Sequence, residues 1–203
     1  MAKGKLFVIS GPSGTGKGTI CKSILENEAD VKLSVSMTTR IPREDEVDKV
    51  HYYFVEQGIF EQLIDESGFM EYASVYGNYY GTPKKQVLQW LSQGNDVILE
   101  IDVQGALQVK KNYPQCVLIF ILPPSFEELK SRIEGRGSET KETMTRRLGE
   151  ALHEISFIGR YDYRIVNDDL HKAIAEVRGI ITTERCKIDE GEALRIIGKY
   201  KEE

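Results

Sequence analysis

The sequence predicts an α/β fold in which a parallel sheet is flanked by helices. Three short runs carry this prediction: residues 6–9 and 117–122 are continuously apolar, and residues 97–101 are apolar except for Glu100. A strand that is apolar along its whole length is covered on both faces, which is typical of parallel sheets. A glycine-rich turn and the start of a helix follow the first run directly. We therefore place the 6–9 strand in the core and take it as the reference for the rest of the chain.

The segment from Leu6 to Thr19 reads LFVISGPSGTGKGT. Its glycines permit a tight loop without side chains, so that backbone amides converge on an anion, and the helix beginning near Lys17 adds its unpaired amides and dipole. The spacing of Gly11, Gly16 and Lys17 matches G-x-x-x-x-G-K, the P-loop that binds nucleotide phosphates. The residues predicted to bind ATP here are Gly11, Pro12, Ser13, Gly14, Thr15, Gly16, Lys17, Gly18 and Thr19.

The last position of the motif departs from the pattern. A Ser or Thr normally follows the lysine and contacts magnesium, but Gly18 stands here and Thr19 comes one step later, about 100° further round a helix. A second candidate is Glu100, since a carboxylate at the end of a neighbouring buried strand can hold magnesium through water. We expect Mg²⁺ to be held mostly by phosphates and water, with Thr19 or Glu100 assisting, and a structural role for Glu100 stays open.

Composition excludes several classes of function. The chain has 203 residues, a net charge of -5, 40% hydrophobic and 29% charged residues, which predicts one globular domain. Its mild acidity argues against a nucleic-acid binder. We expect no membrane segment and a cytoplasmic location, because no apolar run approaches spanning length and residues 1–5 contain no signal-peptide core. Three scattered cysteines indicate neither a disulfide framework nor a CxxC metal site. Monomer and homodimer both stay open.

In chain order, the first helix should end near Asn27, and an alternating, half-exposed strand is expected over 32–37, with Ser36 on its polar face. The loop that follows carries Arg40 and Arg43 around Pro42. Two forked guanidiniums at this spacing can close on one phosphate group from different sides. A solvated basic turn is the alternative reading of the same spacing.

Aromatic alternation and an amphipathic piece at 58–66 indicate an inserted α+β lobe before a helix over 83–91. The strand over 117–122 is stopped by two prolines, and Ser125 is the expected N-cap of the next helix. A mixed charged segment follows, which on composition alone is the solvated face of a helix pair. After a strand over 163–166, Asp168 and Asp169 are expected helix caps for a closing helix.

Several separate motifs, in order, resemble those of guanylate kinases, the enzymes that phosphorylate GMP with ATP. Ser36 is followed by TTRIPR at 38–43 and by Tyr52 and Phe54; the later segments are FMEYA at 69–73, GNYYGT at 77–82, EIDVQG at 100–105, PPS at 123–125, RIEGRGSE at 132–139, RL at 147–148 and VNDDL at 166–170. The resemblance covers roughly residues 6–175. The family usually has glycines at the positions held here by Asp45 and Lys49.

The resemblance implies a division of one domain, residues 1–203, into three parts. The core is a P-loop NTPase fold made of 1–35, 83–125 and 159–203, the GMP-binding lobe is 36–82, and a helical lid is 126–158. It implies contacts from Arg40, Arg43, Tyr52 and Tyr80 to the GMP phosphate. The lid arginines that would move onto ATP are Arg132, Arg136 and Arg147. Asn167 is the candidate contact for the ATP base region.

Guanine chemistry agrees with the remaining assignments. Its N1–H and N2 amine are donors, which suit the ionised carboxylates of Glu71 and Asp102, while hydroxyls of Ser36 and Thr82 can donate toward O6 or N7. Adenine would place its N1 lone pair against the same carboxylates. Two such mismatches, at about 1–3 kcal/mol each, supply a preference of roughly a thousandfold.

The sequence thus predicts a transfer of the γ-phosphoryl group from ATP to GMP, with dGMP as a further acceptor, in the presence of Mg²⁺. Lys17, Arg40, Arg43 and the lid arginines would carry catalysis by positioning and charge neutralisation. One alternative is a catalytically silent guanylate-kinase-like module that binds proteins. Another is adenylate kinase, which shares the G-K-G-T loop ending but whose other motifs do not occur here.

Overall fold

In this computed structural model, which describes residues 3–75, 77–134, 141–188 and 190–201, the chain forms an α/β fold. The central sheet has five parallel strands in the order β2-β7-β1-β8-β9. Their bounds are β1 Leu6–Ser10, β2 Val31–Leu33, β7 Asp96–Glu100, β8 Val117–Leu122 and β9 Tyr163–Val166. The predicted parallel sheet is confirmed, and β1 lies at its centre.

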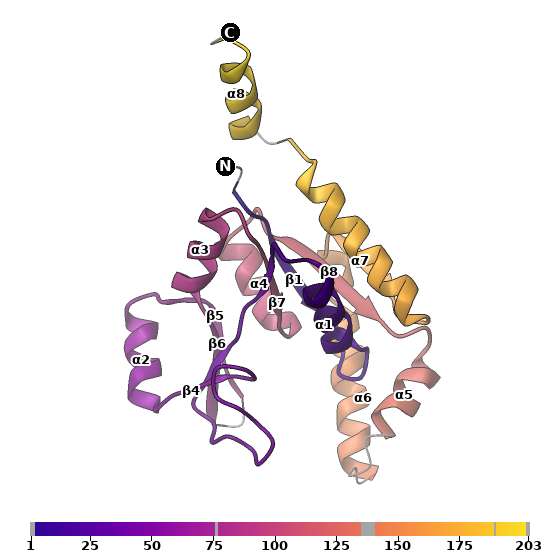
Figure 1. The fold of residues 1–203 in the computed structure, drawn as a ribbon. Helices are drawn as coiled ribbons and strands as arrows, with labels where there is room; N and C mark the ends of the chain where they lie inside the picture. Colours follow the sequence, from indigo (N-terminus) through magenta and orange to yellow (C-terminus); the bar gives the residue numbers. More distant parts are fainter. Residues whose placement is uncertain (1–2, 76, 135–140, 189, 202–203) are drawn as a thin grey trace.

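Helices cover both faces of the central sheet (Figure 1). One face carries α1 (Lys17–Asn27) and α7 (Leu170–Arg185), and the other carries α3 (Lys84–Ser92) and α4 (Val103–Asn112). Along β1, Phe7 and Ile9 pack toward the first pair, while Leu6 and Val8 pack toward the second. All four side chains are buried, so the first apolar run is covered on both faces, as predicted.

A second sheet is inserted between β2 and α3, with the strand order β4-β3-β6-β5. Its strands are β3 Met37–Thr38, β4 Tyr53–Phe54, β5 Phe69–Val75 and β6 Asn78–Pro83, and α2 spans Gln57–Asp65. The hairpin of β5 and β6 is its longest pairing. Figure 1 shows this sheet and α2 beside the central sheet. The chain therefore carries an inserted α+β piece, as the aromatic alternation predicted.

The predicted single strand over 32–37 is wrong. β2 ends at Leu33 in the central sheet, and β3 begins at Met37 in the second sheet. Between them, the amide of Ser34 donates to Ile98 at 3.0 Å, whereas the carbonyl of Ser36 accepts from Tyr53 at 2.9 Å. The chain changes sheet within three residues. Both pieces alternate in the same way, so the sequence pattern contained no sign of the crossing.

The last third of the chain adds helices at both sides of β9. They are α5 (Phe126–Glu134), α6 (Lys141–Ile155), the short 3-10 turn Ile158–Arg160 and α8 (Glu190–Lys199), which projects beyond α7 in Figure 1. Two predicted N-caps are confirmed: Ser125 Oγ accepts from the Glu128 amide at 3.1 Å, and Asp169 Oδ1 from the Lys172 amide at 2.8 Å. Within the described residues, no helix has the length and apolar character to cross a membrane.

Candidate active site

A cavity of about 390 Å³ lies where β1 and β7 end, between the central sheet and the second sheet. Four parts of the chain contribute to its wall: the glycine-rich loop, the second sheet, the end of β7 and helix α6. The lining residues are Gly11, Ser13, Lys17, Ser36, Tyr52, Glu71, Ala73, Val75, Tyr80, Gly81, Glu100, Ile101, Asp102 and Glu154. The carboxyl ends of parallel strands are the usual place for ligand sites in open α/β sheets.

The loop between β1 and α1 has the backbone that its glycines predict. Gly11, Gly14 and Gly16 have φ values of 140°, 88° and 86°, in the region that favours glycine. A β-carbon on Gly11 would lie 2.2 Å from the carbonyl oxygen of Ile121, so no other residue fits there without movement. Lys17 Nζ donates to the carbonyls of Gly11 at 2.5 Å and Pro12 at 2.9 Å, so its side chain folds across the loop.

Asn167, at the end of β9, supports this loop. Its buried side-chain amide donates to the carbonyl of Thr15 at 2.8 Å, and a β-carbon on Gly16 would lie 2.5 Å from the same nitrogen. The guanidinium of Arg132 donates to the Asn167 carbonyl at 3.1 Å and pairs with Glu128 at 2.7 Å. The Asn167 side chain thus holds the P-loop. Its contact with the ATP base stays a prediction.

The three predicted lid arginines lie in different surroundings. Arg132 on α5 reaches the end of β9 through the bonds described above, and its β-carbon lies 3.7 Å from where a β-carbon of Gly14 would be. Arg147 is a half-buried residue of α6. Arg136 falls outside the described residues. The structure therefore brings Arg132 to the P-loop, while movement of the lid onto ATP stays a prediction.

Glu100 lies against the position where the P-loop pattern is broken. A β-carbon on Gly18 would be 3.6 Å from each carboxylate oxygen of Glu100, and Glu100 lines the same cavity as Lys17. Burial raises the pKa of Glu100, and the charge of Lys17 opposes that rise. Thr19 is exposed on α1 and does not line the cavity. Among the described residues, no group of three or more His, Cys, Asp or Glu side chains could hold a metal ion.

Two carboxylates of the cavity lining lie close to each other, on either side of Gly105. Glu71 on β5 is only 7% exposed, and its Oε1 accepts from the Thr82 hydroxyl at 2.6 Å. Asp102 caps α4, with Oδ1 accepting from the Gly105 amide at 2.9 Å. A β-carbon on Gly105 would lie 2.9 Å from Glu71 Oε2, so glycine at this position leaves room for the Glu71 carboxylate.

Burial raises the pKa of Glu71 to about 7. The hydrogen bond from Thr82 opposes this shift, and the charge of Asp102 adds to it. Thr82 is fully buried beside Glu71 and does not line the cavity, so in this arrangement its hydroxyl acts on Glu71. Ser36 does line the cavity. The direct contact of Thr82 with guanine stays a prediction.

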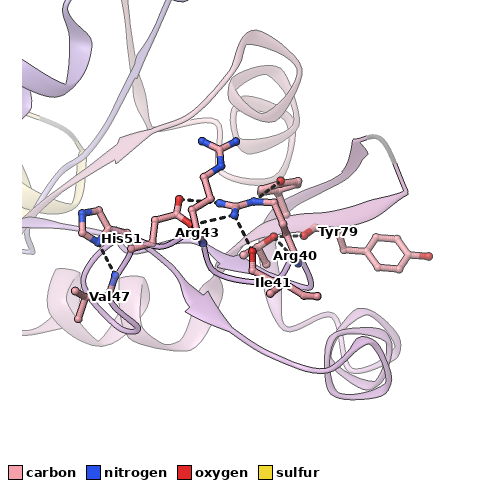
Figure 2. Close-up of polar contacts among 9 residues, drawn as sticks. Arg40, Ile41, Arg43, Val47, His51 and Tyr79 are labelled. Atoms are coloured by element: carbon pink, nitrogen blue, oxygen red, sulfur yellow. Dashed lines mark hydrogen bonds and ion pairs between the residues drawn. The ribbon is translucent and has the colours of Figure 1, made fainter. Parts of the chain in front are cut away.

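Tyr52 and Tyr80 also line the cavity, and Arg40 contacts both of them. Arg40 Nε donates to the Tyr80 hydroxyl at 3.2 Å, and its guanidinium lies 5.7 Å from the centre of the Tyr52 ring. The same guanidinium forms an ion pair with Glu46 at 2.8 Å. Figure 2 shows the exposed Arg43 side chain directed away from this ion pair. Arg40 and Arg43 were predicted to close on one phosphate group from different sides, and their side chains do not converge in this structure.

Three residues of the site were not anticipated from the sequence. Glu154 on α6 lines the cavity, and burial raises its pKa to about 7 against the opposing charge of Lys17. Its position seven residues after Arg147, or about two helical turns, is a signal that it shares a face with that arginine. The sequence contains no comparable signal for Gly105 or Glu46. Gly105 matters because it lies beside Glu71, and Glu46 because it pairs with Arg40, and neither contact follows from helical or strand periodicity.

The fold and the site together define a class. A five-stranded parallel sheet ends at a P-loop with its lysine, and a second sheet faces that loop across a cavity that is also lined by carboxylates and tyrosines. These features define a P-loop nucleotide kinase.

Comparisons with known proteins identify the family within this class. The family model described as guanylate kinase matches residues 3–184. The guanylate kinase of Caldanaerobacter subterraneus is 50% identical over 99% of this chain and 97% of its own length, and that of Clostridium tetani is 55% identical over 93% and 90%. The crystal structure of guanylate kinase from Anaplasma phagocytophilum matches with a TM-score of 0.75 and 34% identity, covering 92% of this chain and 88% of that one. The chain belongs to the guanylate kinase family.

Proposed function

We propose that the protein transfers the γ-phosphoryl group of ATP to GMP, giving ADP and GDP. The observation that carries this proposal is one cavity that joins the P-loop lysine to two carboxylates and two tyrosines. The first group suits a polyphosphate, the second a base with donor groups on its edge, and the third a phosphate monoester. The membership of the chain in the guanylate kinase family supports the same reaction.

On the donor side, the P-loop amides and Lys17 are proposed to bind the phosphates of ATP. The positive φ values of the loop glycines and the support from Asn167 favour such a role, since both hold the backbone in the form of an anion-binding turn. Arg132, Arg136 and Arg147 are proposed to add positive charge when the lid closes, which would also exclude water from the transferred group.

On the acceptor side, Glu71 and Asp102 are proposed to accept from guanine N1–H and the N2 amine, with Ser36 and Thr82 nearby. The closeness of these two carboxylates in the cavity lining supports this assignment. Tyr52, Tyr80, Arg40 and Arg43 are proposed to bind the phosphate. That phosphate is already an anion at neutral pH, so the transfer needs positioning and charge neutralisation rather than a strong base.

Magnesium is the proposed cofactor. The residues fit it, because the Glu100 carboxylate lies against Gly18 at the edge of the P-loop, within the same cavity as Lys17. There Glu100 would hold the ion through water, with Thr19 as the weaker candidate. When bound, the ion neutralises charge on the ATP phosphates.

Residues 36–82 and 126–158 are proposed to act as a GMP-binding lobe and a lid that move relative to the core. Such motions are common where a kinase must exclude water before transfer. The cytoplasm stays the expected location on sequence grounds, nucleic acid is not an expected partner, and the choice between monomer and homodimer stays open.

The test is an assay of ADP release with ATP, magnesium and, in turn, GMP, AMP, CMP and UMP. We expect rapid release with GMP alone, and a Lys17→Ala variant serves as the control because loss of the P-loop cation should abolish most of the activity. Equal turnover with AMP would contradict the guanine assignment. Binding of GMP without any turnover would indicate the silent binding module, which the comparisons do not favour.

A further inference from the structure

Glu46 is the central acceptor of the loop between β3 and β4. Its Oε1 accepts from Arg40 NH2 at 2.8 Å, and its Oε2 accepts from Arg40 NH1 at 2.9 Å and from the Arg43 amide at 2.8 Å. Only 18% of the Arg40 side chain and 12% of the Glu46 side chain are exposed. Such bidentate pairs fix the plane of the guanidinium as well as its position.

These contacts leave Arg40 little freedom. A guanidinium has five N–H groups, and four of them are used: two by Glu46, one by the carbonyl of Ile41 at 2.8 Å, and Nε–H by the Tyr80 hydroxyl at 3.2 Å. Dashed lines in Figure 2 mark polar contacts on opposite sides of the Arg40 guanidinium. The hydrogen bond to Tyr80 is therefore directed by the partners on the opposite side of Arg40.

The direction of that bond determines what Tyr80 can do. Its oxygen accepts from Arg40, and arginine has no acceptor that could take the phenol proton in return. Tyr80 lines the cavity, so its O–H is left to donate to an acceptor there. A phosphate oxygen is such an acceptor, and a neutral donor held beside a cation suits it.

We propose that Glu46 is a positioning residue for the phosphate of GMP, acting through Arg40 on the hydroxyl of Tyr80. This inference rests on the proposed assignment of Arg40 and Tyr80 to that phosphate. Simple electrostatics predicts the opposite effect, because a carboxylate near the phosphate repels it and its removal should strengthen GMP binding. The sign of the change on removing the Glu46 charge therefore separates positioning from repulsion.

The test compares GMP with guanosine, which lacks the phosphate, as ligands of a Glu46→Gln variant in titration calorimetry. We expect GMP to bind about tenfold more weakly and guanosine to bind as in the parent protein, since only the phosphate contact is disturbed. In steady-state kinetics, the KM for GMP should rise while kcat and the KM for ATP change little. Glu46→Asp should recover part of the lost affinity.

Glu44→Gln is the matched control, because it removes the same charge from an exposed residue of the same loop. We expect its GMP affinity to equal or slightly exceed that of the parent. Unchanged or stronger GMP binding by Glu46→Gln would overturn the positioning role, and so would an equal weakening of GMP and guanosine, which would indicate a general loss of structure.

Tyr80→Phe separates this inference from the assignment on which it rests. If Tyr80→Phe leaves GMP binding unchanged, the assignment of Tyr80 to the phosphate is wrong. If Tyr80→Phe weakens GMP binding but Glu46→Gln does not, only the positioning role fails. When both variants weaken GMP binding, the double variant should lose less affinity than the sum of the two single losses, because both changes act on the Tyr80 hydroxyl.

Discussion

Glu71 shows how the surroundings of one residue can set both its charge and its use. The carboxylate lies in a buried position, keeps one hydrogen bond from Thr82, and faces Asp102 in the cavity. It accepts most strongly from the donor edge of guanine when it is ionised, because both of its oxygens are then acceptors, yet its pKa is raised to about 7. The proposed base recognition therefore depends on a group that titrates near neutral pH.

We predict that guanosine binds about tenfold more tightly at pH 8 than at pH 6, because Glu71 passes from mostly protonated to mostly ionised over that range. Guanosine avoids titration of a substrate phosphate. Calorimetry at several pH values is the measurement. Asp102, Glu154 and Lys17 also line the cavity, so Glu71→Gln is the control. If the pH dependence survives in Glu71→Gln, it belongs to another group.

The same raised pKa has a consequence for stability. An acid whose pKa rises on folding destabilises the folded state once it ionises. For Glu71 this destabilisation grows between pH 4.5 and 7 and is complete above pH 7. A shift of this size corresponds to an upper limit of roughly 3 kcal/mol. Glu71→Gln cannot ionise at this position. Its free energy of unfolding, measured with denaturant, should therefore increase relative to that of the parent protein as the pH rises from 4.5 to 7.

Gly105 is a residue whose importance comes from the absence of a side chain. We predict that Gly105→Ala weakens guanosine and GMP binding alike, by about tenfold, because the new β-carbon would lie 2.9 Å from Glu71 Oε2 and would displace that carboxylate. Gly149 has open space at its β-carbon position in helix α6, so Gly149→Ala is a control. Unchanged guanosine affinity of Gly105→Ala in calorimetry would show that Glu71 is not displaced or does not contact the base.

At the scale of elements, the loop between β3 and β4 is closed by its own contacts. The Val47 amide donates to His51 Nδ1 at 3.0 Å (Figure 2), the Lys49 amide to the Tyr52 carbonyl at 2.7 Å, and the Phe54 amide to Asp48 at 3.1 Å. Lys49 has a φ of 66°, in the left-handed region. This is one of the two positions where the sequence departs from the glycines usual in the family, and the structure shows that the backbone there still has a glycine-like form.

We predict that Lys49→Gly stabilises the protein by about 0.5–1 kcal/mol, because relief of the left-handed strain exceeds the entropy that glycine adds to the unfolded chain. Thermal unfolding should show this as a rise in Tm of about 1–4 °C. Asp45→Gly, at the other departing position, is the control: Asp45 is not among the positive-φ residues described, so glycine there should lower Tm. A fall in Tm for Lys49→Gly would contradict the strain argument.

At the scale of the whole molecule, the family match and the buried core end at nearly the same place. The family model stops at residue 184, and α7 contributes Ala173, Val177 and Ile181 to the core. The helix beyond it, α8, projects beyond α7 in Figure 1, and its Leu194 and Ile197 are exposed. The catalytic fold therefore does not depend on packing by α8.

We predict that a chain ending at residue 188 keeps its kcat and its KM for both substrates, with a Tm within about 2 °C of the parent, since no residue of α8 belongs to the core clusters of the described chain. Activity assays and thermal unfolding of the shortened chain are the measurements. A chain ending at residue 176, which removes Val177 and Ile181 from the core, is the contrasting case and should not fold. Loss of activity in the 188 variant would assign a role to α8.

Much of the fold was predictable because its signals are local. The strand at 117–122 has the predicted bounds, the P-loop lies between a buried strand and a helix, and Ser125 and Asp169 cap helices as expected. Each of these features depends on residues within a few positions of one another. The missed crossing between β2 and β3 has the opposite character, because the two halves of the segment pair with different partners, Ile98 and Tyr53.

The candidate site shows the same contrast between features that local sequence predicts and features that depend on contacts between distant segments. The P-loop motif and the resemblance to guanylate kinases were enough to name the P-loop lysine, two carboxylates and two tyrosines that the structure places around one cavity. Only the tertiary structure brought Glu154 into the cavity, paired Arg40 with Glu46, and showed that Gly105 makes room for Glu71. These relations join segments that chain periodicity does not connect. Burial and proximity, which raise the pKa of Glu71, exist only after folding has brought those segments together.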